Sequence, residues 1–403
     1  MVTREDLARA RERVRGVVRP THLDRSDTFS RLLGRPVALK PEHLQRTGSF
    51  KIRGATNFIS TLAPGTEVVA ASAGNHAQGV ALAAARAGLT ATIFMPTSAA
   101  LPKVEATRNY GGSVRFAGDT VDDAIAEAKA YAAGRHATFV PPFDDPLVIA
   151  GQGTIGLELA EEAPDAEVVV VPVGGGGLIS GVAAALKTAP GRGGRPAPRV
   201  VGVEAAGAAC MAASLAAGSP VRLAALATMA DGIAIKGPSL LTLAHVRAYV
   251  DEIVTVDDDE IARAVVLLLE RAKAVVEPAG AVGLAALLAG KIGGDGLAVA
   301  VLSGGNVDPF LLLQLIDRGL SASGRYLILR VQLEDRPGAL AALTAAVATM
   351  GLNVLAVEHH RSGLLLPMEQ VEVVLTLETR DPGHRTEVVD GLRAQGYRVE
   401  MTD

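Results

Sequence analysis

Four consecutive glycines at residues 174–177 follow an apolar run at 168–173 and precede an apolar segment at 178–184. A buried strand that ends in glycines and leads into a helix is typical of α/β folds. Backbone N–H groups in such a loop, together with the N-terminus of the helix, can bind an anion such as phosphate. The loop is neither a GxGxxG fingerprint nor a P-loop, because no Lys-Ser/Thr pair follows. By itself it predicts either a phosphate site or only a tight turn.

The region between residues 37 and 302 alternates short β-branched runs with alanine-rich stretches. This rhythm predicts βαβ units and open parallel sheets, in which ligands bind at the carboxyl ends of the strands. The expected strands are residues 67–71, 90–95, 113–116, 138–140, 168–173, 200–203 and 297–302, and the expected helices include 78–87, 102–110, 121–133 and 153–162.

Lys51 lies where an extended segment at 37–40 gives way, through a Thr-Gly-Ser turn, to an expected helix at 53–61. Lys51 follows the aromatic residue Phe50 and has small residues nearby in the sequence, so its amine can be held partly desolvated. Desolvation lowers the pKa of a lysine and favours the neutral amine that Schiff-base chemistry needs. The alternative interpretation is a solvated lysine on the first turn of a helix.

Two further loops follow expected strands. The sequence Ser72-Ala73-Gly74-Asn75-His76 comes after the apolar residues 68–71, and its hydroxyl and N–H groups predict a second anion site. Asn75 can donate to a phenolate-like oxygen, cap the next helix, or do both. Ser303 begins a Ser-Gly-Gly-Asn turn directly after the strand expected at 297–302.

These four segments, in this order, resemble the serine/threonine dehydratase family of fold-type II pyridoxal-phosphate enzymes. The resemblance implies a two-lobed catalytic domain at residues 1–320, with a small lobe at about 54–146 and the cofactor, pyridoxal 5'-phosphate, between the lobes. It implies that Lys51 is the catalytic residue and that Ser72, Ala73, Gly74, Asn75 and His76 bind the substrate. The cofactor-binding residues that it implies are Phe50, Lys51, Asn75, Gly174, Gly175, Gly176, Gly177, Leu178 and Ser303.

The implied reaction is β-elimination of water from L-threonine, which yields 2-oxobutyrate and ammonia. A neutral Ser303 hydroxyl at the pyridine nitrogen would not hold that nitrogen protonated, which favours prompt elimination. A serine dehydratase or a serine racemase is the first alternative, although Ala73 stands where similar racemases carry a proton-donating serine. An amino-acid sensor with a vestigial catalytic core is the second, and the intact motifs argue against it.

Two acidic residues outside these motifs, Glu204 and Glu277, lie at positions that have a role in similar enzymes. Glu204 stands where relatives begin a cation site, but Cys210 replaces a carboxylate that would help to close it. We therefore expect no metal and expect Glu204 to be a surface acid. Glu277, in the sequence Glu-Pro-Ala-Gly-Ala, matches the family and is expected near the cofactor.

The residues after a linker at 321–325 have a different pattern. Residues 326–403 read as strand, helix, two strands, helix and strand, which predicts a ferredoxin-like βαββαβ fold. The Asp-Arg-Pro-Gly-Ala-Leu turn and the Gly-Leu-Asn segment resemble an ACT domain. The resemblance implies regulatory roles for Asp335, Gly338 and Asn353 and an amino-acid effector, isoleucine or valine. The alternative is a domain that only holds subunits together. In either case we expect a homo-oligomer, a dimer or tetramer.

Composition sets the remaining bounds. The chain has 403 residues and is 49% apolar, enough for two or three domains with large cores. A net charge of −4 with interspersed signs argues against a surface for nucleic acid or an anionic membrane. Charges near the N-terminus, the absence of a long apolar run and a single cysteine lead us to expect a cytoplasmic protein.

Overall fold

The computed structural model describes residues 1–189, 196–322, 324–361 and 369–402. The chain forms two compact units, Met1–Leu312 and Leu313–Asp403. Helix α13 (Pro309–Ala322) runs across the boundary between them, so the first two residues of the linker expected at 321–325 are helical. Residue 323 of that linker lies outside the described residues.

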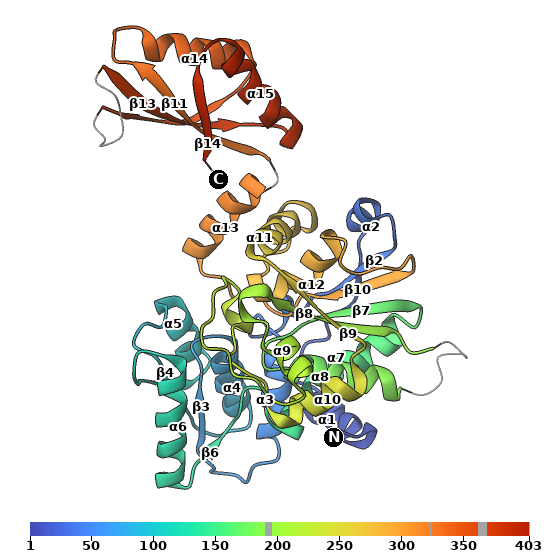
Figure 1. The fold of residues 1–403 in the computed structure, drawn as a ribbon. Coiled ribbons are helices and arrows are strands. Elements are labelled where there is room, and N and C mark those ends of the chain that lie inside the picture. The colour runs from blue at the N-terminus through green and yellow to red at the C-terminus, as the bar shows by residue number, and fades with distance from the viewer. Residues whose placement is uncertain (190–195, 323, 362–368, 403) are drawn as a thin grey trace. The chain divides into compact units, whose positions relative to one another are not determined.

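Over the described residues of the first unit, the strands form two sheets (Figure 1). The larger contains, in spatial order, β1 (Asp24–Arg25), β2 (Val37–Lys40), β10 (Leu297–Val301), β7 (Ala166–Pro172), β8 (Arg199–Ala205) and β9 (Glu252–Val256). The smaller contains β5 (Gly112–Phe116), β4 (Ala91–Met95), β3 (Val68–Ala71) and β6 (Thr138–Phe139). Every neighbouring pair is parallel except β1 with β2. The predicted open parallel sheets are therefore confirmed.

Helices connect these strands. The first half of the unit contains α1 (Arg4–Val14), α2 (Asp27–Leu33), the 3-10 turn η1 (Glu42–Leu44), α3 (Lys51–Ile59), α4 (Asn75–Arg86), α5 (Leu101–Asn109), α6 (Val121–Arg135) and α7 (Pro146–Glu162). The second half contains α8 (Gly177–Thr188), η2 (Ala206–Ala208), α9 (Cys210–Ala217), η3 (Asp231–Ile233), α10 (Leu240–Tyr249), α11 (Asp258–Leu267), the π-helical turn η4 (Leu268–Ala272) and α12 (Pro278–Leu288).

Both faces of the smaller sheet are buried. Val68 and Ala70 of β3 pack in one apolar cluster with α4, whereas Val69 and Ala71 pack in another with α6. Successive side chains of a strand point to opposite faces, so this alternation places a helix on each side of the sheet. The arrangement leaves the carboxyl ends of the strands, rather than the faces, available for a ligand.

The start of one helix and the presence of one strand differ most from the expectations. Helix α7 begins at Pro146, not 153, because the Asp145 carboxylate accepts hydrogen bonds from the N–H groups of Leu147 and Val148 and so caps the helix earlier. The edge strand β9 does not stand out in the sequence. Its residues are mostly half-buried, so it lacks the continuous apolar run of its neighbours.

The second unit has the predicted βαββαβ order, with β11 (Tyr326–Glu334), α14 (Ala339–Thr349), β12 (Val354–His360), β13 (Gln370–Glu378), α15 (Pro382–Ala394) and β14 (Arg398–Thr402). Its sheet is antiparallel in the order β12-β13-β11-β14. One apolar cluster joins this sheet to both α14 and α15. The ferredoxin-like prediction is therefore confirmed. No helix within the described ranges is long and apolar enough to cross a membrane.

Candidate active site

The first unit contains a cavity of about 640 Å³, within the size range of small-molecule and cofactor sites. It is lined by every residue of the catalytic, cofactor and substrate sets expected from the sequence: Phe50, Lys51, Ser72, Ala73, Gly74, Asn75, His76, Gly174, Gly175, Gly176, Gly177, Leu178 and Ser303. These residues come from both sheets of the unit. The structure therefore brings the four motifs together in one place.

Lys51 is the first residue of α3, and its Nζ donates a hydrogen bond to the Pro142 carbonyl oxygen at 3.0 Å. Burial lowers the pKa of Lys51 to about 8, although the nearby Glu277 carboxylate opposes this shift. Burial, and then the charge of Lys51, lowers the pKa of His76 to about 3, so the imidazole is neutral. Its Nε2 lies 2.9 Å from the Val140 carbonyl oxygen and is therefore the protonated nitrogen. Lys51 is thus a half-buried residue whose desolvated amine loses its proton more readily than that of an ordinary lysine.

The tetraglycine loop connects β7 to α8, and Gly177 is the first residue of that helix. Its surroundings leave no room for side chains. A Cβ at Gly175 would overlap the ring of Phe143, and one at Gly177 would lie 2.8 Å from the Phe143 Cβ. Gly176 also has a φ of +90°, which disfavours other residues. The loop therefore presents bare backbone and a helix N-terminus to the cavity, which fits a phosphate group.

Replacing Gly175 with alanine should push the loop away from Phe143 and weaken pyridoxal-phosphate binding. Overpacking a tight site costs about 1–3 kcal/mol, so the dissociation constant should rise roughly tenfold or more. Titration of the cofactor-free protein, followed by visible absorbance, measures this constant. Gly134→Ala is the matched control, because a Cβ there meets nothing within 4 Å. An unchanged constant in Gly175→Ala would mean that the loop does not contact the cofactor.

The Ser303 segment is tied to the turn that carries Lys51. The Ser303 carbonyl oxygen accepts a hydrogen bond from the Phe50 N–H at 3.1 Å, and Ser49 pairs with Gly304 in an isolated bridge. Ser303 itself is buried and lines the cavity. In the loop at 72–76, the Ser72 hydroxyl accepts from the Gly74 N–H at 3.1 Å. Backbone hydrogen bonds thus fix the Ser303 segment against the turn that carries Lys51, and a local hydrogen bond shapes the loop at 72–76.

Several lining residues were not expected from the sequence. Phe143 packs on the glycine loop. The irregular segment 219–239 supplies nine lining residues: Arg222, Leu226, Asp231, Gly232, Ile233, Ala234, Ile235, Lys236 and Gly237. The Asp231 carboxylate pairs with Lys103 at 2.7 Å. Asp122 of α6 pairs with Arg222 at 2.7 Å and with Lys236 at 3.0 Å. These ion pairs join the helices of the smaller sheet to that segment. No periodic pattern marks the segment, so nothing in the sequence signals its place.

The expectation that Glu204 is a surface acid is wrong. Glu204 is 0% exposed, at the end of β8, and its carboxylate accepts hydrogen bonds from the N–H groups of Met211 at 2.7 Å and Ala212 at 2.8 Å. Burial raises the pKa of Glu204 to about 7. The carboxylate therefore caps the first turn of α9 from the end of a neighbouring strand. Across the described residues, no group of three or more His, Cys, Asp or Glu side chains could hold a metal ion.

Comparison with known proteins matches the two units to two families. Residues 14–304 match the model of the pyridoxal-phosphate dependent enzymes, and residues 327–393 match the ACT domain. The chain is 47% identical to an L-threonine ammonia-lyase of Geobacter sulfurreducens, over 98% of each chain. It is 48% identical to an L-threonine ammonia-lyase of Thermotoga maritima, over 100% of each.

Solved structures of similar fold include a threonine deaminase and a serine racemase. The processed form of threonine deaminase isoform 2 from Solanum lycopersicum superimposes with a TM-score of 0.73 at 37% identity, covering 78% of this chain and 87% of that one. Maize serine racemase superimposes with a TM-score of 0.73 at 35% identity, covering 79% and 98%. The chain therefore belongs to the family of pyridoxal-phosphate dependent enzymes that contains these L-threonine ammonia-lyases, and it carries an ACT domain in its C-terminal part.

Proposed function

We propose that this protein is a threonine ammonia-lyase that converts L-threonine to 2-oxobutyrate and ammonia. The observation that carries the proposal is the position of Lys51, a half-buried residue whose amine has a pKa of about 8, in the same cavity as the glycine loop and Ser303. The full-length similarity to two L-threonine ammonia-lyases supports threonine as the substrate. The residue roles that follow are part of this proposal.

The residues fit pyridoxal phosphate, since the glycine loop is shaped for a phosphate and Lys51 for its aldehyde. When bound, the cofactor supplies a ring that withdraws electrons from the α-carbon of an amino acid. The loop at 72–76 would hold the substrate carboxylate and so orient the Cα–H bond toward Lys51. The Nζ of Lys51 would take the α-proton, for which a pKa of about 8 is well suited.

The neutral Ser303 hydroxyl favours rapid elimination, because it does not stabilise a negative charge that would otherwise persist on the substrate. It cannot hold a neighbouring ring nitrogen protonated as a carboxylate would, so loss of the β-hydroxyl with the α-proton, together one water, becomes the favoured outcome. Hydrolysis of the released enamine consumes one water and gives 2-oxobutyrate and ammonia. Ala73 has no hydroxyl to return a proton to the opposite face, which disfavours racemisation.

A substrate panel tests the proposal. The ratio kcat/KM should be highest for L-threonine, lower for L-serine and lowest for D-serine, and chiral analysis should find little D-serine formed from L-serine. A protein that prefers L-serine, or that racemises serine faster than it deaminates threonine, would instead be the serine dehydratase or racemase.

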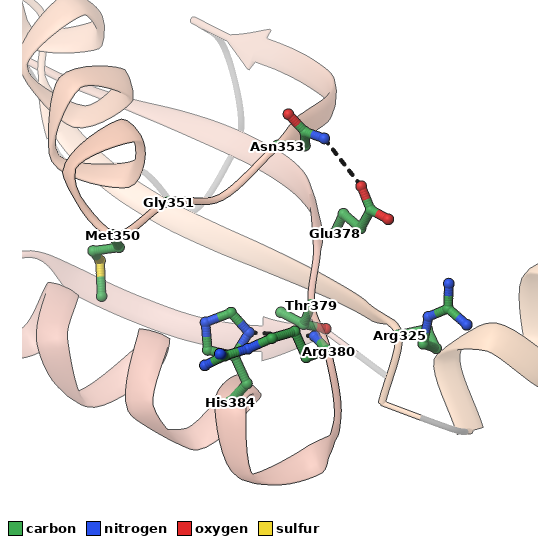
Figure 2. Close-up of a pocket in the computed structure, with 8 residues that line it drawn as sticks. All are labelled: Arg325, Met350, Gly351, Asn353, Glu378, Thr379, Arg380 and His384. Atoms are coloured by element: carbon green, nitrogen blue, oxygen red, sulfur yellow. Dashed lines mark hydrogen bonds between the residues drawn. The ribbon is translucent and has the colours of Figure 1, made fainter.

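We propose that the ACT domain binds an amino-acid effector such as isoleucine or valine. The second unit contains a cavity of about 600 Å³, lined by Arg325, Met350, Gly351, Asn353, Glu378, Thr379, Arg380 and His384 (Figure 2). Asn353 donates to the Glu378 carboxylate at 3.1 Å. This carboxylate suits an ammonium group, the arginines suit a carboxylate, and Met350 offers an apolar contact.

The three expected regulatory residues do not lie together within one copy of the domain. Asn353 precedes β12 at the end of the sheet where Tyr326 pairs with Glu378, whereas Asp335 and Gly338 follow β11 at the other end. A Cβ on Gly338 would meet nothing within 4 Å, and its φ is +88°. The backbone conformation of the turn thus accounts for this glycine without a ligand.

Glu378→Gln should raise the concentration of isoleucine or valine needed to change turnover by about tenfold, because a hydrogen bond to a charged group contributes roughly 1.5–3 kcal/mol. Glu400→Gln, an exposed change on β14, should leave the response intact. A loss of response in Asp335→Asn instead would assign the effector to the turn after β11. If neither amino acid alters turnover or Tm at any concentration, the domain does not sense them.

We also propose that the protein is a cytoplasmic homo-oligomer. Cys210 is free and buried, which suits a reducing compartment. The edge strand β12 exposes Val354, Leu355 and Val357, and such apolar edges tend to pair with another chain. Light scattering of the purified protein decides between monomer, dimer and tetramer.

A further inference from the structure

Asn75 is held by a chain of hydrogen bonds whose direction can be assigned. Asn306 Nδ2 lies 2.7 Å from the backbone carbonyl oxygen of Thr47 and 2.7 Å from Asn75 Oδ1. On its other side, Asn75 Nδ2 lies 2.7 Å from Glu277 Oε1. A backbone carbonyl only accepts, so the group of Asn306 that faces Thr47 must be its NH₂. That NH₂ then donates to Asn75, which must present its oxygen to Asn306 and its nitrogen to Glu277.

The two ends of this chain are fixed by the fold. Glu277 is 4% exposed and occupies the N-cap position of α12, and its N–H donates to the Gly304 carbonyl oxygen at 3.0 Å. Thr47 belongs to the turn that leads to Lys51, four residues later. The chain therefore links the turn of the reactive lysine, the first residue of α4 and the start of α12. Both Asn75 and Glu277 line the cavity.

We propose that Asn306 and Glu277 are positioning residues that fix the orientation of the Asn75 amide. The described contacts use one hydrogen of Asn75 Nδ2, toward Glu277. Its second hydrogen is then available to an anionic ring oxygen of the cofactor. With the amide reversed, Asn75 would present a carbonyl oxygen to that anion and repel it. This inference rests on the proposed function, which places Asn75 against the cofactor.

The charge of Glu277 adds to this arrangement. Burial, and then the charge of Asp231, raises the pKa of Glu277 to about 7, while the Asn75 hydrogen bond, Lys103 and Lys51 lower it. These are the groups that face Glu277 from the surrounding elements. An ionised Glu277 is the stronger acceptor and therefore holds the Asn75 nitrogen in place more firmly.

Asn306→Asp tests the inference, because aspartate can no longer donate to Asn75 and instead accepts from it, which reverses the amide. We expect the dissociation constant for pyridoxal phosphate to rise at least tenfold, measured by visible absorbance on the cofactor-free protein. Asn57→Asp is the matched control. Its Nδ2 also donates to a backbone carbonyl, that of Leu147, at 2.7 Å, but the residue does not line the cavity. This control should have a lower Tm than the wild type but the same affinity for the cofactor.

The double variant Asn306→Asp/Glu277→Gln separates orientation from stability. The glutamine can donate to Asn75 while the aspartate accepts from it, so the hydrogen bonds are formed in the reverse direction. We expect its Tm to exceed that of Asn306→Asp, while the affinity for the cofactor stays low. The inference would be overturned if the double variant recovered its affinity for the cofactor together with its Tm. It would also be overturned if the affinity of Asn306→Asp stayed within twofold of the wild-type value.

Glu277→Gln alone gives a second readout if Asn306→Asp does not fold. Loss of the negative charge should destabilise the protonated form of the Lys51-bound cofactor, so the pH at which its visible band changes should fall. An unchanged titration would contradict a role for Glu277. A wild-type protein that binds no pyridoxal phosphate refutes the proposed function, whereas a wild type that binds it with unaffected variants refutes only this inference.

Discussion

Lys51→Ala is expected to lower kcat for L-threonine by about 10³-fold or more while leaving the protein folded. The lost amine is the group proposed to hold the cofactor and move the α-proton, and the proton transfer alone is worth about two to four orders of magnitude. The Tm of the cofactor-free protein should not fall, because the variant removes a desolvated amine whose pKa is already lowered to about 8 by burial. Borohydride reduction and peptide mapping should find the cofactor on Lys51 in the wild type and on no residue in the variant.

Two controls sharpen this result. Lys51→Arg keeps a cation but supplies no neutral amine, so it should be as inactive as Lys51→Ala. Lys187→Ala, which removes an ion pair with Asp251, should keep its turnover. In the cofactor-free wild type, the rate of cofactor capture should rise with pH to about 8 and then level off, whereas an ordinary lysine would react faster up to about pH 10. Near-normal turnover in Lys51→Ala would remove Lys51 from the mechanism.

Arg53→Met should lower the free energy of unfolding by about 3–5 kcal/mol, the usual cost of breaking a buried ion pair from one side. The side chains of Arg53 and Glu42 are both 0% exposed. Arg53 donates to Glu42 at 2.8 Å through both Nε and Nη2, to Glu158 at 2.6 Å and to Thr154 at 3.0 Å. Without the guanidinium, two carboxylates lose their shared cation behind the helix that carries Lys51.

Chemical denaturation followed by circular dichroism measures this loss. Arg199→Met is the control, because Arg199 and Glu252 form an ion pair at 3.0 Å with side chains 42% and 44% exposed. Such exposed pairs contribute less than about 1 kcal/mol. Equal destabilisation of the two variants would show that the buried network does not stabilise the fold.

The sequence pattern is most informative where a local rule determines the structure. The tetraglycine loop, the strand before it and the helix after it are contiguous, so their arrangement follows from neighbouring residues alone. The same holds for the βαβ rhythm and for the turn that begins at Ser303. Lys51 could be assigned because the resemblance of its flanking residues outweighed the ordinary expectation of a solvated lysine.

The features that the sequence does not predict depend on long-range packing. From the sequence, Glu204 is expected to be a surface acid. In the structure, two backbone N–H groups of α9 donate hydrogen bonds to its carboxylate. The sequence around Phe143 does not predict its contact with Gly175, which lies 32 positions later in the chain. The segment 219–239 has no repeating pattern, yet it lines the cavity. In each case the partner lies on another element, and only the fold brings the two together.

The most direct measurement incubates the purified protein, loaded with pyridoxal phosphate, with L-threonine and quantifies both products. The account predicts one 2-oxobutyrate and one ammonia for each threonine consumed, and no reaction with Lys51→Ala. A cofactor-loaded wild type that leaves L-threonine unchanged, or that yields D-threonine or glycine and acetaldehyde instead, would contradict it.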